Sequence, residues 1–258
     1  MSAHVLIKIG GTLLDAPESR LRLAREVAAA ASGGIEIVVV HGGGKQMTRF
    51  LAERGVESRF VNGLRVTTPE VLDAVLKVLA GSVNQELVSA FTVAGARAVG
   101  LTGIDALLTE AEPLSDELGA VGWPIRSNAG LLHLLTANGY LPVVACVAGG
   151  RDGRMYNVNA DQMAAACASG YGAARLFFLT DVEGVRDENG ATLAELSIPA
   201  MEALIRAGVA TGGMQAKLEA GRKALESGVD EVIVAPGARP GIVAQLLAGS
   251  PAGTRLHR

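Results

Sequence analysis

The stretch Ile35–Lys45, IEIVVVHGGGK, passes from an apolar run into three consecutive glycines, and a helical pattern begins directly after it at Gln46. The apolar run predicts a buried strand over Ile35–Val40, and the glycines predict a tight turn before a helix N-terminus. Glycine has no Cβ, so backbone N–H groups in such a turn can approach an anion closely, and the helix dipole adds positive potential there. We therefore expect phosphate or carboxylate oxygens at His41–Gly44. The alternative is a tight connection that binds nothing.

Other apolar runs extend this strand and helix pattern along the chain. Helical patterns separate them, over 21–31, 46–54, 69–94 and 162–169. Such an alternation predicts an α/β protein with an open, mainly parallel sheet. The further strands are expected at Val5–Ile9, Ala98–Leu101, Leu141–Ala145, Leu176–Leu179 and Glu231–Val234. Between 98 and 138 the pattern changes to short pieces with Gly, Asp and Pro, which predict hairpins and a lid.

Composition narrows the classes of protein that the 258-residue chain can belong to. Hydrophobic residues make up 49% and aromatic residues 3%, so the core is built from aliphatic side chains, which suits parallel strands covered by helices. The net charge is −3 and no basic stretch stands out, which argues against nucleic acid as a partner. No apolar run reaches the ~18 to 20 residues that span a bilayer, and no secretion signal is evident. We expect a cytoplasmic protein, with Cys146 and Cys167 as buried hydrophobic residues.

The longest helical pattern covers residues 69–94. Thr67-Thr68-Pro69-Glu70 is a typical helix start, and apolar residues then recur at helical spacing. A helix of this length exceeds what one small core needs. Either its outer face packs on a second copy of the chain, or it is a central helix buried on all sides.

Polar residues in the same turns are candidates for chemistry. Lys8 precedes the glycine pair Gly10-Gly11 at the end of the first strand, and the carboxyl ends of parallel strands share one crevice, so Lys8 should face the 41–44 turn. The guanidinium of Arg65 suits bidentate binding of a carboxylate. Asn157, Asn159 and Asp161 alternate before a helix, and helix capping explains only one of the three.

Several familiar catalytic motifs are absent from the sequence. Gly44-Lys45 is followed by Gln46, so it is no Walker loop, and the first strand lacks the GxGxxG of dinucleotide-binding proteins. There is no GxSxG or HExxH motif, and the cysteines have no evident catalytic partner. Catalysis must therefore rest on lysines, amides and one or two carboxylates.

Six short motifs together resemble the amino-acid kinase family over essentially the whole chain. They are KIGG at 8–11, HGGGK at 41–45, NGLRVT at 62–67, NVNAD at 157–161, TDVEGV at 180–185 and GGMQAK at 212–217. NGLRVT together with NVNAD is typical of the branch that phosphorylates N-acetyl-L-glutamate. The resemblance implies a single domain over 1–258, folded as a three-layer αβα sandwich. Its N-terminal lobe, about 1–170, would bind the acyl amino acid and dimerise, and its C-terminal lobe, about 171–258, would bind ATP.

The resemblance also implies the reaction and the residues that perform it. The γ-phosphoryl group of ATP would pass to the side-chain carboxylate of N-acetyl-L-glutamate, in the second step of arginine biosynthesis. Lys8 and Lys217 would stabilise the transition state and Asp161 would hold both. Mg²⁺ would be carried by the nucleotide, with no metal site made by the protein. Substrate would be bound by Gly43, Gly44, Arg65, Asn157 and Asn159, and nucleotide by Gly10, Gly11, Thr180, Asp181, Gly184, Val185 and Thr211.

Two departures from the family pattern affect the acceptor side. Lys45 stands where this branch often has proline, and 102–106 lacks the second glycine of a GxDG stretch. The acyl group can therefore be acetyl or succinyl, and carrier-linked aminoadipate is a further alternative acceptor. A non-catalytic amino-acid sensor is the alternative from a different class. Because the first strand begins near the start of the sequence, we expect a homodimer, formed through helix 69–94, that is insensitive to arginine.

Overall fold

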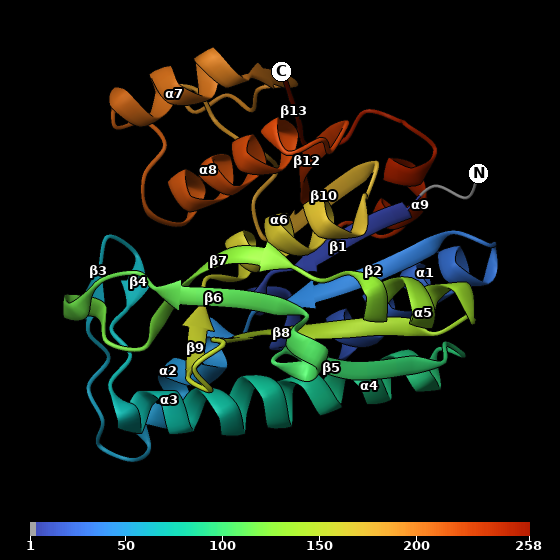
Figure 1. Cartoon of the computed structure of the whole chain (residues 1–258). Coiled ribbons are helices and arrows are strands. Elements are labelled where there is room, and N and C mark those ends of the chain that lie inside the picture. Colours follow the sequence, from blue (N-terminus) through green and yellow to red (C-terminus); the bar gives the residue numbers. More distant parts are fainter. Residues whose placement is uncertain (1–3) are drawn as a thin grey trace.

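An eleven-stranded sheet runs through the computed structural model, which describes residues 4–258 (Figure 1). Its five central strands are parallel, in the spatial order β12, β10, β1, β2, β8. Their side chains are almost all buried, as expected for strands with helices on both faces. Every strand predicted from an apolar run is confirmed, with shifted ends. The central strands span Glu231–Pro236 (β12), Arg175–Thr180 (β10), His4–Ile9 (β1), Glu36–His41 (β2) and Leu141–Gly149 (β8).

Shorter strands complete both ends of the sheet. β11 (Glu195–Ser197) and β13 (Thr254–His257) lie beyond β12, and β5 (Ala98–Gly103) pairs with β8. The region 98–138 contains an antiparallel hairpin, as predicted, and a separate small hairpin stands over the sheet edge. The former consists of β6 (Thr109–Pro113) and β7 (Val121–Ser127), flanked by β9 (Met155–Val158); the latter consists of β3 (Phe60–Val61) and β4 (Leu64–Arg65).

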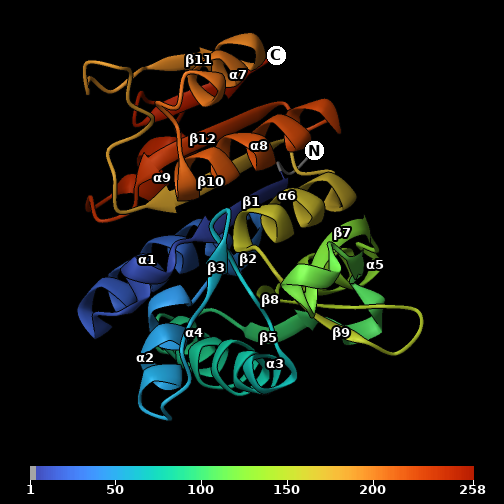
Figure 2. The same cartoon turned by 90° about the vertical axis from the view of Figure 1, so that its left-hand side faces the viewer.

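Helices cover both faces of the sheet, which confirms the three-layer αβα sandwich (Figure 2). The helix predicted at 21–31 begins earlier, at Pro17, because proline fits the first turn of a helix. One layer contains α1 (Pro17–Ser32), α4 (Asn84–Val93) and α9 (Ile242–Leu247), and the other α5 (Gly130–Ala137), α6 (Ala160–Tyr171) and α8 (Gly212–Glu226). The remaining helices are α2 (Gly44–Ala52), α3 (Pro69–Val75) and α7 (Ile198–Arg206), with short 3₁₀ turns at Gly11–Leu14 (η1), Asp105–Leu107 (η3) and Asp116–Leu118 (η4). No helix within residues 4–258 is long and apolar enough to cross a membrane.

The predicted long helix is continuous but not uniformly α-helical. Between α3 and α4 the chain forms a π-helix, η2 (Leu76–Val83), which is wider than an α-helix and is often found at functional sites. The Thr68 side chain accepts a hydrogen bond from the Val71 amide and caps its start, as predicted. One face is buried against the core, whereas Lys77 and Val93 on the other are exposed. A helix buried on all sides is therefore ruled out.

Ala106 occupies a left-handed backbone conformation, with φ 51° and ψ 27°, in the stretch where the family pattern has glycine. The Cβ atom makes this conformation unfavourable for alanine by roughly 1–2 kcal/mol. Replacement by glycine recovers only part of this free energy, because glycine is also more flexible in the unfolded chain. We expect Ala106→Gly to raise the free energy of unfolding in urea by about 0.5–1 kcal/mol. Ala90→Gly, inside α4, is the control and should lower it by about 1 kcal/mol. An equal decrease in the free energy of unfolding of both variants would show that Ala106 is not strained.

Candidate active site

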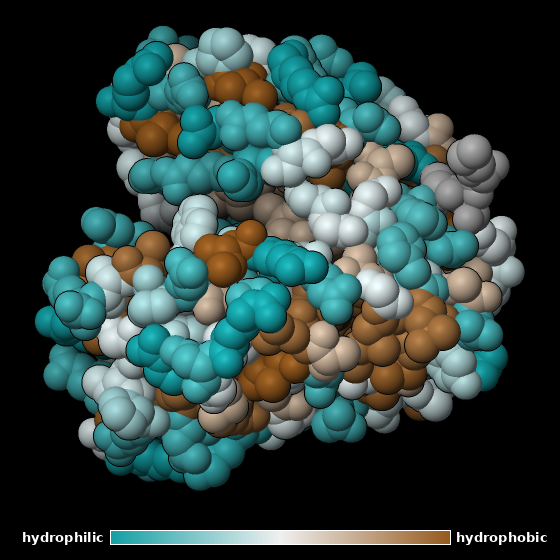
Figure 3. Space-filling model, viewed as in Figure 1, coloured by the Kyte–Doolittle hydropathy of each residue, from teal (hydrophilic) through white to brown (hydrophobic). Residues whose placement is uncertain are grey.

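The carboxyl ends of β1, β2 and β8 border one cavity of about 230 Å³. Lys8 of β1 lies beside Val40 of β2 in the sheet register, so the first strand and the glycine turn meet at this edge, as predicted. The surface of the molecule has a notch on the side where these strands end, at the left of Figure 3. The predicted substrate residues line the cavity together with Lys8 and Asp161: Gly43, Gly44, Arg65, Asn157 and Asn159.

Asp161 lies between two lysines that are far apart in the sequence. One of its carboxylate oxygens is 2.8 Å from Lys8 Nζ, and the other accepts a hydrogen bond of 2.9 Å from Lys217 Nζ. All three side chains are at least nine-tenths buried. The cluster carries a net positive charge, because one carboxylate faces two ammonium groups. A buried charge imbalance of this sign favours an anionic ligand beside it.

Burial and mutual attraction act in opposite directions on these three groups. Burial by itself would raise the pKa of Asp161, but the two ammonium groups outweigh it and hold that pKa below its usual range. Burial and the charge of Lys8 lower the pKa of Lys217, whereas Asp161 opposes them. Asp161 is therefore an ionised carboxylate at neutral pH, and its two oxygens contact the two ammonium groups.

The alternating polar residues before α6 have separate functions. Asn159 caps the helix, because its side-chain oxygen accepts hydrogen bonds from the amides of Asp161 and Gln162. This cap fixes the first turn of α6 and thereby the position of Asp161. The side chain of Asn157 donates instead to Thr67 Oγ1 at 3.0 Å and lines the cavity. Capping thus accounts for one of the three residues, as the sequence predicts.

Arg65 connects the β3–β4 hairpin to the start of α2. Its guanidinium donates to Ser58 Oγ, to Thr48 Oγ1 at 2.8 Å and to the Gly44 carbonyl at 3.2 Å. It also lies 4.6 Å from the centre of the Phe60 ring. Burial lowers the pKa of Arg65, but from so high a starting value that the group stays charged. A fixed cation at the rim of the cavity is suited to binding a carboxylate.

Lys45 points away from the cavity. Its Nζ atom lies 3.9 Å from a carboxylate oxygen of Asp15, and 64% of its side chain is exposed. The helix begins at Gly44, so a residue other than proline is accommodated at position 45. This departure from the family pattern therefore adds no charge to the cavity.

None of the residues predicted for the nucleotide is among those that line the cavity. Gly10 donates to the Leu179 carbonyl at 2.9 Å, and Thr180 Oγ1 donates to Asp181 at 3.2 Å. The charge of Asp181 acts on Lys217, which places it near the cluster. Gly11 packs on the 42–44 turn, Thr211 precedes α8, and Gly184 and Val185 pack against Thr254.

Asn84 is a contact of the site that the sequence reasoning missed. It is buried at the start of α4, and its side-chain amide reaches His41 at 3.0 Å and the Val143 carbonyl at 2.9 Å. The sequence does contain a signal that points to Asn84: it is a single asparagine among the apolar residues on the buried side of helix 69–94, and a buried amide needs hydrogen-bond partners.

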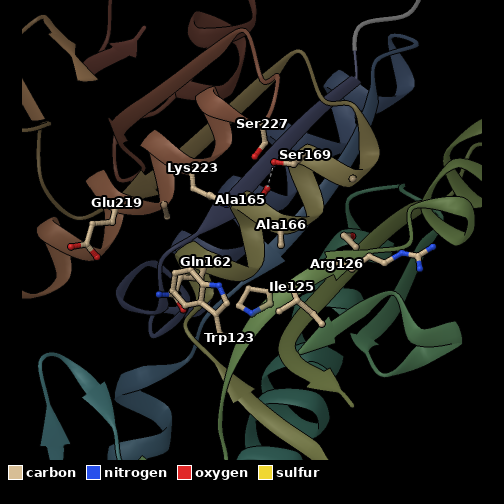
Figure 4. A pocket seen from close by; sticks show the side chains of 14 residues that line it. Trp123, Ile125, Arg126, Gln162, Ala165, Ala166, Ser169, Glu219, Lys223 and Ser227 are labelled. Carbon is tan, nitrogen blue, oxygen red and sulfur yellow. Dashed lines mark hydrogen bonds between the residues drawn. The ribbon is translucent and has the colours of Figure 1, made fainter. Parts of the chain in front are cut away.

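A second cavity lies between β7, α6 and α8, with the side chains of Trp123 and Ile125 facing α6 (Figure 4). Gln162, Glu219 and Lys223 are among its polar lining residues. It includes none of the residues predicted for the site, so the cavity beside Lys8 is the candidate active site.

Comparisons with known proteins agree with this fold. The model of the amino acid kinase family matches residues 4–236, and the chain belongs to that family. It is 60% identical over 252 residues to an acetylglutamate kinase from Solibacter usitatus, covering 98% of both chains. It is 43% identical to an acetylglutamate kinase from Bartonella tribocorum, covering 92% of this chain and 83% of that one.

Solved structures show the same fold. A Streptococcus mutans protein superposes with a TM-score of 0.86 at 27% identity, covering 100% of this chain and 99% of that one. The N-acetylglutamate synthase of Neisseria gonorrhoeae, in complex with coenzyme A and N-acetyl-glutamate, has a TM-score of 0.87 at 23% identity. That match covers 99% of this chain and 59% of the synthase chain, and at this identity it supports the fold alone.

Proposed function

We propose that this protein transfers the γ-phosphoryl group of ATP to the side-chain carboxylate of N-acetyl-L-glutamate, forming an acyl phosphate for arginine biosynthesis. The observation that carries the proposal is the Lys8–Asp161–Lys217 cluster at the end of a cavity whose rim holds Arg65. The 60% identical relative is named an acetylglutamate kinase, which favours the same acceptor.

The chemistry needs positive charge rather than a general base. A carboxylate with a pKa near ~4.3 is ionised at neutral pH and attacks phosphorus directly. Two anions must then meet in line while negative charge spreads over the phosphoryl oxygens. Lys8 and Lys217 would neutralise that charge, with Lys8 between the reacting groups and Lys217 toward the leaving phosphate. Asp161 would keep both ammonium groups in place.

The charges of the cavity favour acetyl over succinyl as the acyl group. Among the described residues, the cationic side chains that line it are those of Lys8 and Arg65. N-acetylglutamate has two carboxylates, one for each cation, and a succinyl group would add a third with no cation to meet it. The rest of the lining is mostly apolar, with Val75, Leu79 and Cys146 among it, and suits a methyl group.

Mg²⁺ would reach this site on the phosphates of the nucleotide. Within residues 4–258 no group of three or more His, Cys, Asp or Glu side chains is placed to hold a metal. Asp181, near Lys217, is the carboxylate that would face the metal and phosphates. The nucleotide would lie in the C-terminal lobe (about 171–258), near Gly10, Gly11, Thr180, Gly184, Val185 and Thr211, and the acyl amino acid in the lobe of about 1–170.

The experiment that tests the function is an ATP-dependent hydroxamate assay with four acceptors. N-acetylglutamate should give the hydroxamate with stoichiometric ADP, whereas N-succinylglutamate, glutamate and aspartate should react at least about tenfold more slowly, since each has the wrong number of charges or lacks the acyl group. Faster reaction of N-succinylglutamate would overturn the acyl assignment. No acyl phosphate from any acceptor would overturn the kinase function.

Arg65→Ala should mainly weaken binding of the acyl amino acid. Loss of a fixed cation that pairs with a carboxylate raises the KM for N-acetylglutamate about 10- to 100-fold, with little change in the KM for ATP. Steady-state kinetics with each substrate varied in turn measure both constants. Arg59→Ala, in the same segment but outside the cavity, is the control. An effect confined to the KM for ATP would argue against this position for Arg65.

We also propose a homodimer that forms through helix 69–94. Leu72, Leu76 and Val88 are only half-buried on that helix, and Val93 is 72% exposed. The adjacent β5 pairs only with β8 among the described strands, so its outer edge is open to a second copy.

Light scattering during size exclusion should give a mass near twice 26.4 kDa, because burial of this apolar face stabilises the pair. Leu72→Glu should give the single-chain mass. Leu134→Glu, a charge on the exposed surface of α5, should leave the dimer intact. A monomeric wild-type protein would refute the proposal.

A further inference from the structure

We propose that His41 and Asn84 form a buried latch that aims the backbone amide of Gly43 into the active site, so that both are positioning residues for phosphoryl transfer. Neither side chain lines the cavity. The kinetic consequence rests on the proposed function, whereas the latch itself has a spectroscopic test that does not.

The hydrogen bonds of the latch allow only one arrangement of protons. His41 is fully buried, and its Nδ1 lies 2.9 Å from the Gly42 carbonyl, which can only accept, so Nδ1 carries the proton. Nε2 is then an acceptor and lies 3.0 Å from the side-chain nitrogen of Asn84. The second proton of that nitrogen goes to the Val143 carbonyl at 2.9 Å.

The imidazole stays neutral over the pH range in which the latch must act. Burial lowers the pKa of His41 to about 4, against the opposing effect of the hydrogen bond to Gly42. A neutral ring with a single N–H bonds the Gly42 carbonyl and the Asn84 amide at the same time, with no proton left over.

The latch determines which way the next peptide group faces. The carbonyl of Gly42 and the N–H of Gly43 belong to one planar trans peptide and point in opposite directions. Holding that carbonyl against His41 therefore turns the Gly43 N–H away from the core. The other carbonyls of the turn are also engaged: Gly43 accepts from the Met47 amide and Gly44 from Arg65.

The amides that remain face the space beside Gly11. Within residues 4–258, the N–H groups of Gly43 and Gly44 donate to no other residue. A Cβ on Gly11 would lie 3.2 Å from the Gly43 nitrogen and 3.1 Å from the Gly44 nitrogen. Any side chain at position 11 would therefore crowd both amides, and glycine there leaves them accessible to an anionic oxygen.

The long helix supports the turn at two points. Asn84 follows directly on the π-helix η2, and Leu79 of η2 packs so closely on the turn that a Cβ on Gly43 would come within 2.4 Å of it. On the far side of Asn84, a Cβ on Gly100 would come within 2.2 Å of its side-chain oxygen. Gly100 thus leaves the room that Asn84 needs to reach His41.

Two substitutions of His41 separate the two halves of the latch. In His41→Asn the amide nitrogen takes the place of Nδ1 and still donates to Gly42, whereas in His41→Gln the amide lies where Nε2 was and that donor is lost. We expect His41→Gln to lower kcat about 10- to 100-fold, as for loss of one aimed amide, with an unchanged KM for ATP. His41→Asn should keep at least about a third of the wild-type kcat. Melting temperatures of both variants separate this effect from unfolding.

Gly100→Ala tests the latch from outside the active site. The added methyl group must displace Asn84, so kcat should fall about tenfold, because the turn is then held less firmly. Gly130→Ala is the matched control, since its Cβ would meet nothing closer than 3.5 Å. Equal kcat in His41→Gln and His41→Asn, or an unchanged kcat in Gly100→Ala, would overturn the positioning function.

Nitrogen NMR of the His41 ring tests the latch without any substrate. The wild-type spectrum should show a protonated Nδ1 and a bare Nε2 from pH 8 down to about pH 5, because the ring is buried and neutral. The opposite tautomer, or titration near pH 6.5, would overturn the latch. An inactive wild-type protein with the expected spectrum would instead refute the proposed function and leave the latch in place.

Discussion

Lys217→Ala and Lys8→Ala should each lower kcat by about 10²–10⁴-fold while the protein remains folded. Each lysine places one ammonium group, almost fully buried, beside Asp161, and a buried cation acts strongly on charge that develops in the transition state. Removal of one lysine leaves Asp161 paired with the other, so no unpaired charge is buried. Steady-state kinetics together with a circular dichroism spectrum measure the two parts of this prediction.

Lys223→Ala provides the matched control for Lys217. It lies on the same helix, α8, but its side chain is exposed and outside the cavity. It should keep wild-type kcat within about twofold, as surface substitutions usually do. Activity of Lys217→Ala equal to that of Lys223→Ala would remove Lys217 from the mechanism.

Asp161→Asn should be the most destabilising of the conservative substitutions. It leaves two buried ammonium groups without a counter-charge, and breaking a buried ion pair by removing one partner costs about 3–5 kcal/mol. Urea unfolding at pH 7 measures the loss. Asp152→Asn is the control, because its pair with Arg154 is exposed and contributes little to stability.

The pH dependence of the Asp161→Asn variant follows from the sign of the lysine shift. Burial lowers the pKa of Lys217 in the folded state, so the unfolded state binds more protons at alkaline pH and stability rises with pH. Without the opposing effect of Asp161 the shift grows. The difference in the free energy of unfolding between this variant and the wild-type protein should therefore become smaller between pH 7 and pH 9.5. A gap that stays constant would show that the lysines are not the cause of the loss.

Much of the fold and half of the site could be predicted from the sequence, because both depend on local patterns. Apart from Glu36, the run Ile35–Val40 is apolar on both faces, as is typical of parallel central strands. Lys8 and the 42–44 turn end neighbouring parallel strands, so topology alone brings them to one edge. Asn159 is recognisable as a helix cap from its place before α6.

The rest depended on long-range packing that a linear pattern does not contain. Asn84 resembles any polar residue in a helix until the fold brings it to His41. The π-helix of η2 and the left-handed Ala106 are conformations that residue preferences disfavour and that only tertiary contacts impose. The nucleotide residues stay predictions, because they were assigned by resemblance and not by geometry.

The position of β1 has a consequence for how the chain is made. Among the described strands it is the first to be synthesised, yet it lies in the middle of the sheet, between β2 and β10. β2 follows at once, whereas β10 begins only at Arg175, roughly ten to thirty seconds later at usual rates of synthesis. Throughout that interval one edge of this mostly apolar strand has no partner within its own chain. We therefore expect truncated nascent chains that end before Arg175 to depend on chaperones, and that dependence to fall once β10 has emerged.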